Sequence, residues 1–307
     1  MTKSGVAILG IYVADLAFRA ARQPAMGETI LGSAFSMGPG GKGSNQSVAA
    51  ARAGAAVTFI TKLGKDNFGD AALAMYAKEG ITAHAPQDPN NSTGAAYIFL
   101  EEKTGSNAII VVAGAAGTIA VADIEAAGDV IRNAKIFMTQ LEQPIPSARR
   151  GLEIAKDAGT ITIFNPAPAA VLDDAIYKFC DYVTPNESEA STLTGVTVTD
   201  IESARKAADV FLNKGVGAVI ITLGGQGSLL HSRTQSIHIP VYSAGKVVDT
   251  TGAGDAFNGG FAAALARGEN PVQAAHFGSA TAGISVTRAG TAPSMPYRDE
   301  VLALLKK

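Results

Sequence analysis

The sequence has little cysteine and little net charge. Cys180 is the single cysteine among 307 residues, so no internal disulfide can form, and this is typical of a reducing compartment. Lysine and arginine, 25 together, nearly balance aspartate and glutamate, 27 together, and no basic run is longer than two residues. This balance provides no overall attraction to nucleic acid or to an anionic membrane. An anionic ligand would therefore have to be bound by a local site.

Long hydrophobic runs are also missing. No stretch reaches the roughly 18–20 apolar residues that a membrane span needs, and the N-terminal segment lacks a signal-peptide cleavage pattern. The four histidines have no metal-binding spacing, and neither a Ser-His-Asp arrangement nor an H-E-x-x-H motif is indicated. We therefore expect a cytoplasmic protein with neither a membrane nor a nucleic-acid partner.

Short apolar runs alternate with helical patterns along most of the chain. GVAILGIYV, AVTFITKLG and GAVIITLGG each read as one strand, whereas FGDAALAMYAKEG and IESARKAADVFLNKG read as helices. This alternation predicts an α/β fold, with a mostly parallel sheet covered by helices on both faces. The length and a hydrophobic content of 47% fit one large domain over residues 1–307.

Two segments interrupt this alternation. Residues 12–40 have no clear helix pattern, and residues 91–112 read as a hairpin that turns at EKTGSN. We predict that both are inserted in the core and form a small separate sheet that covers a ligand. An exposed β-arm, or one used only for dimer contact, is the alternative.

Polar and glycine residues follow several predicted strands. Glu142, Asn165, Asn186 with Glu189, and the loop from Gly224 to Gly227 all occupy such places. In open parallel sheets, ligands bind outside the carboxyl ends of the strands. This ordering predicts a ligand site at one edge of the sheet.

The segment GPGGKGSNQ, residues 38–46, contains a G-x-G-x-x-G pattern before a predicted helix. A nicotinamide-binding fingerprint needs an acidic residue after the next strand, where this chain has Lys62, and a P-loop needs Ser or Thr after its lysine, where Lys42 is followed by glycine. We interpret the segment as a loop where backbone approaches a polar small molecule, with Lys42 and Asn45 as hydrogen-bonding groups. A plain loop-to-helix turn is the alternative.

Two further motifs are ambiguous when taken alone. Asn186 and Glu189 in PNESEA offer oxygen atoms that suit Mg²⁺ through water, but they also fit an N-cap with an acidic first turn. The loop TLGGQG, from Thr222 to Gly227, fits an anion-binding nest, but also a glycine-rich hairpin turn.

The segment VVDTTGAGDAFNGG, residues 247–260, places one carboxylate behind a permissive loop. A helix that starts near Ala253 would direct its free N–H groups at the loop, and Gly252 and Gly254 allow close backbone approach. This arrangement suits phosphoryl transfer, with amides that stabilise the moving phosphoryl group and Asp255 as the base for a hydroxyl. A simple helix cap at Asp255 would not explain the small residues that follow.

Together these motifs resemble the ribokinase-like carbohydrate kinase family over nearly the whole chain. GGKGSNQ and DTTGAGDAFNGG are the most specific, and QLE, NPAP, TPNESEA and ITLGGQG lie between them in the family's order. The resemblance implies a Rossmann-like αβα sandwich with a small β-sheet lid, often used in a homodimer. It also implies ATP-dependent phosphorylation of a sugar's primary hydroxyl with Mg²⁺, and activation by a monovalent cation, typically K⁺.

The resemblance assigns roles to individual residues. Asp255 is implied as the base, and the anion hole comprises Gly252, Ala253 and Gly254. The implied sugar-binding residues, besides Asp255, are Asp15, Gly41, Lys42, Asn45 and Glu142. The implied nucleotide-binding residues are Asn186, Thr222, Gly224, Gly227 and Gly254, with Glu189 acting on Mg²⁺. The implied K⁺ positions, several through backbone carbonyls, are Asp249, Thr251, Ser285, Arg288, Gly290 and Ser294.

One position departs from the family's pattern. Members usually have asparagine two residues before the aspartate matched to Asp15, and this chain has Val13. A valine cannot hydrogen-bond a sugar hydroxyl, so a changed choice of sugar is possible. D-ribose, giving D-ribose 5-phosphate, is the leading expectation. Another pentose, a hexose, a nucleoside or a sugar phosphate stays open, and a non-catalytic sensor is the alternative from another class.

Overall fold

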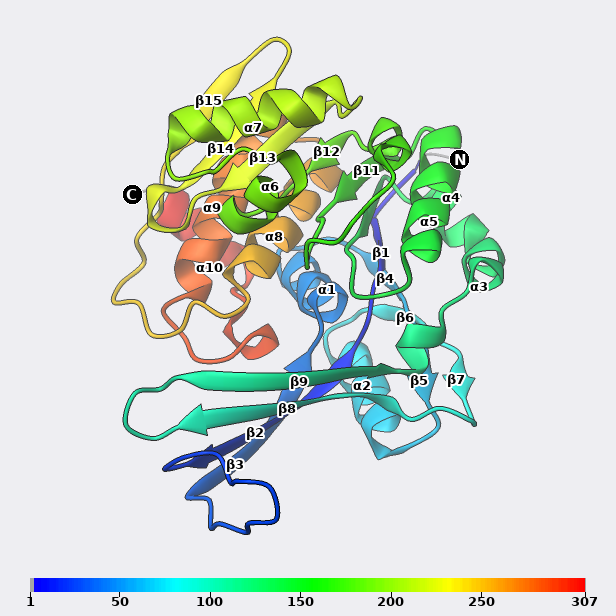
Figure 1. Cartoon of the computed structure of the whole chain (residues 1–307). Coiled ribbons are helices and arrows are strands. Elements are labelled where there is room, and N and C mark those ends of the chain that lie inside the picture. The colour runs from blue at the N-terminus through cyan, green and yellow to red at the C-terminus, as the bar shows by residue number, and fades with distance from the viewer. Residues whose placement is uncertain (1–2, 307) are drawn as a thin grey trace.

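The computed structural model describes residues 3–306 and contains one large and two smaller sheets (Figure 1). The large sheet has nine strands in the order β15-β14-β13-β12-β11-β10-β1-β4-β6. All neighbours from β6 to β13 are parallel, and β14 and β15 extend the sheet antiparallel. Its strands are β1 (Val6–Leu9), β4 (Val57–Ile60), β6 (Thr82–His84), β10 (Ile136–Thr139), β11 (Ile161–Phe164), β12 (Tyr182–Val183), β13 (Ala218–Thr222), β14 (Ser228–Ser232) and β15 (Ser236–Ile239).

Helices cover both faces of this sheet, which confirms the predicted αβα sandwich. Alternate strand residues enter two separate cores: Val6 and Ile8 lie in one, and Ala7 and Leu9 lie in the other. The first core is closed by α1 (Lys42–Arg52), α2 (Asn67–Lys78), α8 (Ala253–Arg267), α9 (Pro271–Ser285) and α10 (Arg298–Leu305). The second is closed by α3 (Val121–Ala126), α4 (Gly128–Asn133), α5 (Ile145–Asp157), α6 (Glu187–Thr194) and α7 (Ile201–Asn213). Short 3₁₀ turns are η1 (Ala115–Thr118), η2 (Asp174–Phe179), η3 (Gly224–Gln226) and η4 (Ala292–Ser294).

The predicted second sheet is present and lies to one side of the helical body (Figure 1). It has four strands in the order β3-β2-β8-β9, namely β2 (Val13–Ala20), β3 (Ala34–Gly40), β8 (Thr93–Glu101) and β9 (Asn107–Gly114). The last two form the expected antiparallel hairpin. A two-stranded sheet of β5 (Leu63–Gly64) and β7 (Gln87–Asp88) lies nearby.

The apolar run GVAILGIYV differs from its prediction as one strand. It is divided between β1 of the large sheet and the start of β2 in the small sheet. The break falls at Gly10, where an added Cβ would lie 2.7 Å from the Cα of Gly43 and 2.5 Å from Oε1 of Gln140. The chain therefore crosses the beginning of α1 where only glycine fits, and the run is apolar because the residues on both sides of the break are buried.

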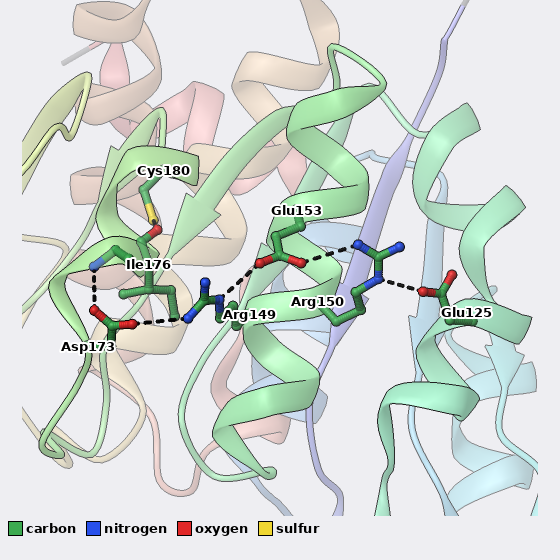
Figure 2. A network of polar contacts seen from close by, with 8 residues as sticks. Glu125, Arg149, Arg150, Glu153, Asp173, Ile176 and Cys180 are labelled. Atoms are coloured by element: carbon green, nitrogen blue, oxygen red, sulfur yellow. Dashed lines mark hydrogen bonds and ion pairs between the residues drawn. The ribbon is translucent and has the colours of Figure 1, made fainter.

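Ion pairs on the outer side of α5 connect it with neighbouring segments (Figure 2). Arg149 contacts Glu153 at 2.9 Å and Asp173 at 3.1 Å, and Arg150 contacts Glu125 at 2.6 Å. Such exposed pairs contribute at most about 1 kcal/mol each. Cys180, also in Figure 2, is buried, and burial raises the pKa of its thiol, so it behaves as a small apolar residue.

Within residues 3–306, no helix is both long and apolar enough to cross a membrane.

Candidate functional site

The loop before α8 forms the centre of the candidate site. Gly252 adopts a left-handed conformation with φ 77°, and α8 begins at Ala253, as the sequence predicts. A Cβ on Gly254 would meet nothing within 4 Å, so this face of the first turn is open to a ligand. The N–H of Ala253 already donates to the carbonyl of Thr250 at 3.2 Å, so Ala253 is partly engaged within the turn. The helix N-terminus favours negative charge at this place.

Small residues in α8 allow it to pack tightly on α1. A Cβ on Gly259 would lie 2.4 Å from the Cβ of Ala49 and 2.7 Å from the carbonyl oxygen of Gln46. Glycine at this position therefore lets the two backbones approach closely. This close approach brings the first turn of α8, with Asp255, against the first turns of α1.

Asp255 is buried and bonded to α1 rather than to its own helix. Its Oδ2 accepts a hydrogen bond from Nδ2 of Asn45, and its Oδ1 accepts one from Nε2 of Gln46, both at 3.0 Å. Burial raises the pKa of Asp255, while the charge of Lys42 and the two amide donors oppose that rise. The geometry therefore does not support the alternative of a helix cap, and it leaves Asp255 as a buried acceptor at a helix N-terminus.

Two glycines let the small sheet and α1 approach each other. A Cβ on Gly40 would lie 2.2 Å from Oδ1 of Asp15, and one on Gly41, with φ 89°, would lie 2.4 Å from the carbonyl oxygen of Ile11. The backbone N–H of Lys42 then donates to Oε2 of Glu142 at 2.7 Å. Asp15, Gly41, Lys42 and Glu142 are thus brought together at the edge between the two sheets.

This edge concentrates charge in a partly desolvated place. Burial raises the pKa of Glu142 to about 7 and that of Asp15 to about 6. Burial of Lys42 disfavours its charge, but the carboxylates of Asp255, Glu142 and Glu189 outweigh this effect and raise its pKa. Lys42 therefore stays cationic among three acidic groups, which suits a polar or anionic ligand.

A cavity of about 140 Å³ joins this edge to the ends of β11, β12 and β13. The predicted residues Asp15, Gly41, Asn45 and Glu142 lie outside its lining. Five separate segments line it, with Lys42, Asn165, Ala167, Thr184, Asn186, Glu189, Thr222, Thr250, Gly252, Ala253, Gly254, Asp255 and Asn258. Asn186 forms a capping box with Glu189, in which Oε2 of Glu189 accepts from the N–H of Asn186 at 2.9 Å. The cap and a ligand role are compatible, because the Glu189 side chain also lines the cavity.

Gly224 and Gly227 lie in the turn between the antiparallel strands β13 and β14, beyond the cavity lining. A Cβ on Gly227, at φ 88°, would lie 2.2 Å from the carbonyl oxygen of Ile239. The hairpin alternative therefore accounts for this glycine by itself. Gly224, at φ 49°, does not line the cavity, but it lies two residues after Thr222, which does.

The predicted K⁺ positions lie in the loop before α8 and in residues 285–294, which hydrogen-bond to that loop at Val286 and Gly290. Asp249 accepts from the N–H of Thr251 at 2.9 Å and from the N–H of Gly290 at 3.0 Å, so it holds two loops together. The side chains of Ser285, Ser294 and Arg288 point elsewhere: they bond to Ala282, Thr291 and Glu300, respectively. In the described part of the chain, no group of three or more His, Cys, Asp or Glu side chains is placed to hold a metal ion. A cation here would depend on backbone carbonyls.

Sequence reasoning missed the buried amides behind Asp255. Gln46, Gln140 and Asn258 are each at most 2% exposed and form hydrogen bonds around it. Gln46 ends the motif GGKGSNQ, and Gln140 begins QLE, so both were adjacent to predicted residues. Only Gln140 had a visible signal, because it directly follows the buried strand β10, whereas Gln46 and Asn258 lie inside helices.

Comparisons with known proteins agree with this arrangement. The model for the family described as pfkB family carbohydrate kinase matches residues 3–298. Ribokinase of Haemophilus influenzae is 40% identical over 91% of this chain and 91% of its own length. Deoxyribokinase of Salmonella typhi is 35% identical over 95% of each chain. The structure of Arabidopsis thaliana ribokinase complexed with ribose and ATP matches with a TM-score of 0.91 and 31% identity, and it covers 100% of both chains.

Proposed function

The chain belongs to the pfkB family of carbohydrate kinases, and we propose that it transfers the γ-phosphoryl group of ATP to the primary hydroxyl of D-ribose. The observation that carries this proposal is the position of Asp255. Its buried carboxylate lines the same cavity as the cation Lys42. The N-terminus of α8, with the open position at Gly254, lines that cavity too. Relatives that include ribokinases support the choice of sugar.

In the proposed reaction, Asp255 accepts the proton of the primary hydroxyl while its oxygen forms a bond to the γ-phosphorus. The bond from the γ-phosphorus to the bridging oxygen breaks, and ADP leaves with that electron pair. The open first turn of α8, with Gly252, Ala253 and Gly254, stabilises the negative charge on the moving phosphoryl group. Lys42 adds a positive charge on the same side.

The sugar is held at the edge between the two sheets. Asp15, Gly41, Lys42, Asn45 and Glu142 are the proposed sugar-binding residues. This assignment is supported by the hydrogen bond from Asn45 to Asp255 and by the one from the N–H of Lys42 to Glu142. Binding in this way holds the sugar hydroxyl next to the carboxylate of Asp255. Most of the entropic cost of bringing the two groups together is then met by binding and not by the chemical step.

The nucleotide is assigned to the other end of the cavity. We assign it to Asn186, Thr222, Gly224, Gly227 and Gly254, of which Asn186, Thr222 and Gly254 line the cavity. Glu189 fits a role toward Mg²⁺ through water, because its carboxylate lines the same cavity and hard cations prefer oxygen ligands. When bound with ATP, Mg²⁺ would neutralise charge on the phosphates.

A monovalent cation such as K⁺ fits the loop that Asp249 organises. The carboxylate of Asp249 accepts from the N–H groups of Thr251 and Gly290, so it holds the backbones of two loops close together. We propose Asp249, Thr251, Ser285, Arg288, Gly290 and Ser294 as its surroundings. The cation would fix the loop that presents the start of α8.

Val13 bears on the choice of sugar. It is 4% exposed and lies on the same face of β2 as Asp15, where a Cβ on Gly94 would come within 2.9 Å of its Cγ1. This position therefore offers an apolar surface, not a hydrogen-bond partner. Because a deoxyribokinase is among the relatives, the substrate panel should hold 2-deoxy-D-ribose, hexoses and nucleosides beside D-ribose. The highest kcat/KM is expected for D-ribose, and a higher value for another sugar would reassign the substrate.

Replacing the base gives the direct test of mechanism. Asp255→Asn keeps the size of the side chain and removes the proton acceptor, so kcat should fall about 10²–10⁴-fold. Binding of ATP and of D-ribose, measured by calorimetry, should persist. A kcat close to that of the wild type would show that Asp255 is not the base. If the wild type bound both ligands without turning them over, the chain would be a sensor.

We also propose that the protein forms a homodimer through the small sheet. Leu16 and Phe18 of β2 share one face with Phe35 and Met37 of β3 and with Ile110 and Val112 of β9. Of these, Phe18, Phe35, Met37, Ile110 and Val112 are between 41% and 64% exposed. A contiguous apolar face of this kind is typical of a contact surface. Asp15 lies on the opposite face, so a partner there would leave the sugar site open.

A further inference from the structure

Gln46 connects the proposed base to the interior of the protein. It lies in the second turn of α1 and is fully buried. Its Nε2 donates to Oδ1 of Asp255 at 3.0 Å and to Oδ1 of Asn165 at 3.1 Å. Its Oε1 accepts from Nε2 of Gln140. Gln46 is not among the residues that line the cavity, so it reaches a ligand only through Asp255 and Asn165, which both line it.

The orientation of the Gln46 amide is determined by its neighbours. Nδ2 of Asn165 donates to the backbone carbonyl of Thr184 at 2.8 Å, which turns Oδ1 of Asn165 toward Gln46. Gln46 then faces two oxygen acceptors, one from Asn165 and one from Asp255, and only its NH₂ group satisfies both. The reversed amide would set oxygen against oxygen at both contacts. Gln46 is therefore a fixed donor to Asp255.

The same chain of contacts reaches the first turn of α8. The hydroxyl of Thr184 donates to Oδ1 of Asn258, and Nδ2 of Asn258 donates to the carbonyl of Gly254 at 2.9 Å. Asn165 after β11 thus holds Asp255 through Gln46, and Thr184 after β12 holds Gly254 through Asn258. A buried amide is held in one geometry when both of its ends are hydrogen-bonded, and the NH₂ group and Oε1 of Gln46 both are.

We propose that Gln46 is a positioning residue for phosphoryl transfer, which holds the carboxylate of Asp255 in one orientation through a hydrogen bond that it can only donate. This inference rests on the proposed function, because it gives Asp255 the role of base. A donor of this kind favours the charged carboxylate over the neutral acid, against the effect of burial. Lys42 acts in the same direction, whereas Glu142 and Glu189, which also face Asp255, act against it.

Gln46→Met tests the proposal because it keeps the length of the side chain and removes the donor. We expect kcat to fall roughly ten- to a hundredfold, since a misplaced reacting group costs about that much. KM for the sugar should change less than about threefold, because Gln46 does not line the cavity. The acid limb of the pH profile of kcat should move up by about one pH unit, because a lost hydrogen bond raises a carboxyl pKa.

Gln143→Met is the matched control. Gln143 is also a buried glutamine, but its Nε2 donates to the hydroxyl of Thr139 at 2.9 Å and to the carbonyl of Gln140, away from Asp255. It should lose stability without a shift of the acid limb. If Gln46→Met does not fold, Gln46→Ser leaves room for water to satisfy Gln140 and Asn165 and should shift the limb in the same direction.

Each outcome separates this inference from the proposed function. A folded Gln46 variant with the wild-type kcat and acid limb would overturn the positioning role, even if Asp255→Asn were inactive. An active Asp255→Asn variant would instead overturn the base assignment itself. An equal shift in Gln143→Met would show that the effect comes from general loss of packing, and this too would overturn the proposal.

Discussion

At the scale of single residues, the site depends on places where backbone and side chain nearly touch. Gly40 is such a place, because any Cβ there would overlap the carboxylate of Asp15. Gly38, two residues earlier in the same strand, has open space instead. Both glycines lie in β3, but only a side chain at position 40 would contact Asp15. Alanine at position 38 is therefore the control for alanine at position 40.

Gly40→Ala should displace the Asp15 carboxylate and weaken sugar binding. A displacement of about 1 Å in a positioned group costs up to about 10²-fold, so we expect KM for the sugar to rise by about ten- to a hundredfold. Gly38→Ala should leave KM within about twofold of the wild type. Steady-state kinetics at saturating ATP measures both, and equal values for the two variants would contradict the assignment of Asp15.

Glu142 makes the stability of the fold depend on pH. Burial raises its pKa from 4.5 to about 7, so the folded chain holds a proton that the unfolded chain releases at lower pH. Stability therefore falls as pH rises from about 4.5 to 7, and the cost is fully present above pH 7.

Glu142→Gln removes this titration and keeps an oxygen for the N–H of Lys42. The variant should gain about 2–3 kcal/mol over the wild type at pH 8 and little at pH 4.5. Urea unfolding at the two pH values gives the comparison. A gain that is the same at both values would mean that the burial of Glu142 is not what limits stability.

At the scale of elements, Arg52 connects three segments at the far end of α1. Its Nε and Nη2 contact the carboxylate of Glu79 at 2.9 and 2.6 Å. Its Nη1 donates to three carbonyls around η4, those of Ala292, Pro293 and Met295. The residue before η4, Thr291, donates in turn to the carbonyl of Pro39 in β3. One arginine thus joins α1 and α2 to the segment that borders the small sheet.

Arg52→Met should therefore destabilise the fold strongly. Both side chains of the ion pair are mostly buried, at 14% and 11% exposure, so Glu79 would keep an unpaired charge. Loss of one partner of a buried pair costs about 3–5 kcal/mol. Arg132→Met breaks an exposed pair with Asp129 and should cost less than about 1 kcal/mol. Chemical denaturation of both variants checks the difference, and a similar cost for the two would contradict a structural role for Arg52.

Helices and strands were predicted correctly where the spacing of apolar residues and a turn or glycine at the end of the segment indicated the same element. α2 ends two residues before Gly80, which has φ 69°, and the hairpin of β8 and β9 turns within the predicted segment. The run through Gly10 was misread because both of its strands are buried and thus equally apolar. Only the contact of Gly10 with Gly43 reveals the crossing, and that contact joins parts of the chain that pattern alone does not relate.

The candidate site was predicted only where the chemistry of a position can be read from its neighbours in the sequence. Asp255, Lys42, Asn186 and Glu189 stand beside glycine loops or strand ends, where the chemistry of each position is visible locally. Gln46 and Asn258 follow inside helices and resemble ordinary polar residues. Their roles arise from helix packing on the sheet, which becomes visible only in three dimensions.

At the scale of the whole molecule, the two faces of the small sheet have different proposed roles. The proposed contact face carries Phe35, 59% exposed, and the opposite face carries Asp15. Phe35→Glu should convert the dimer to a monomer, because a charge in an apolar interface loses its hydration. Val171→Glu, at a residue that is 99% exposed and outside the small sheet, is the control.

Light scattering coupled to size-exclusion chromatography gives the mass of each variant. The wild type and Val171→Glu are expected at twice the chain mass of 31.2 kDa, and Phe35→Glu at the mass of one chain. A wild type that elutes as a monomer, or a dimer that survives in Phe35→Glu, would exclude this face as the contact.

The alternation along β2 has a consequence for how this protein can change. Val13 and Asp15 point to one face, and Leu16 and Phe18 to the other, so the residues proposed for sugar choice and for subunit contact lie on opposite faces of one strand. Substitutions can alter either property separately. A single inserted or deleted codon between Asp15 and Leu16 would exchange the faces of every later residue in the strand. Descendants of this gene should therefore vary in β2 by replacement and almost never by length.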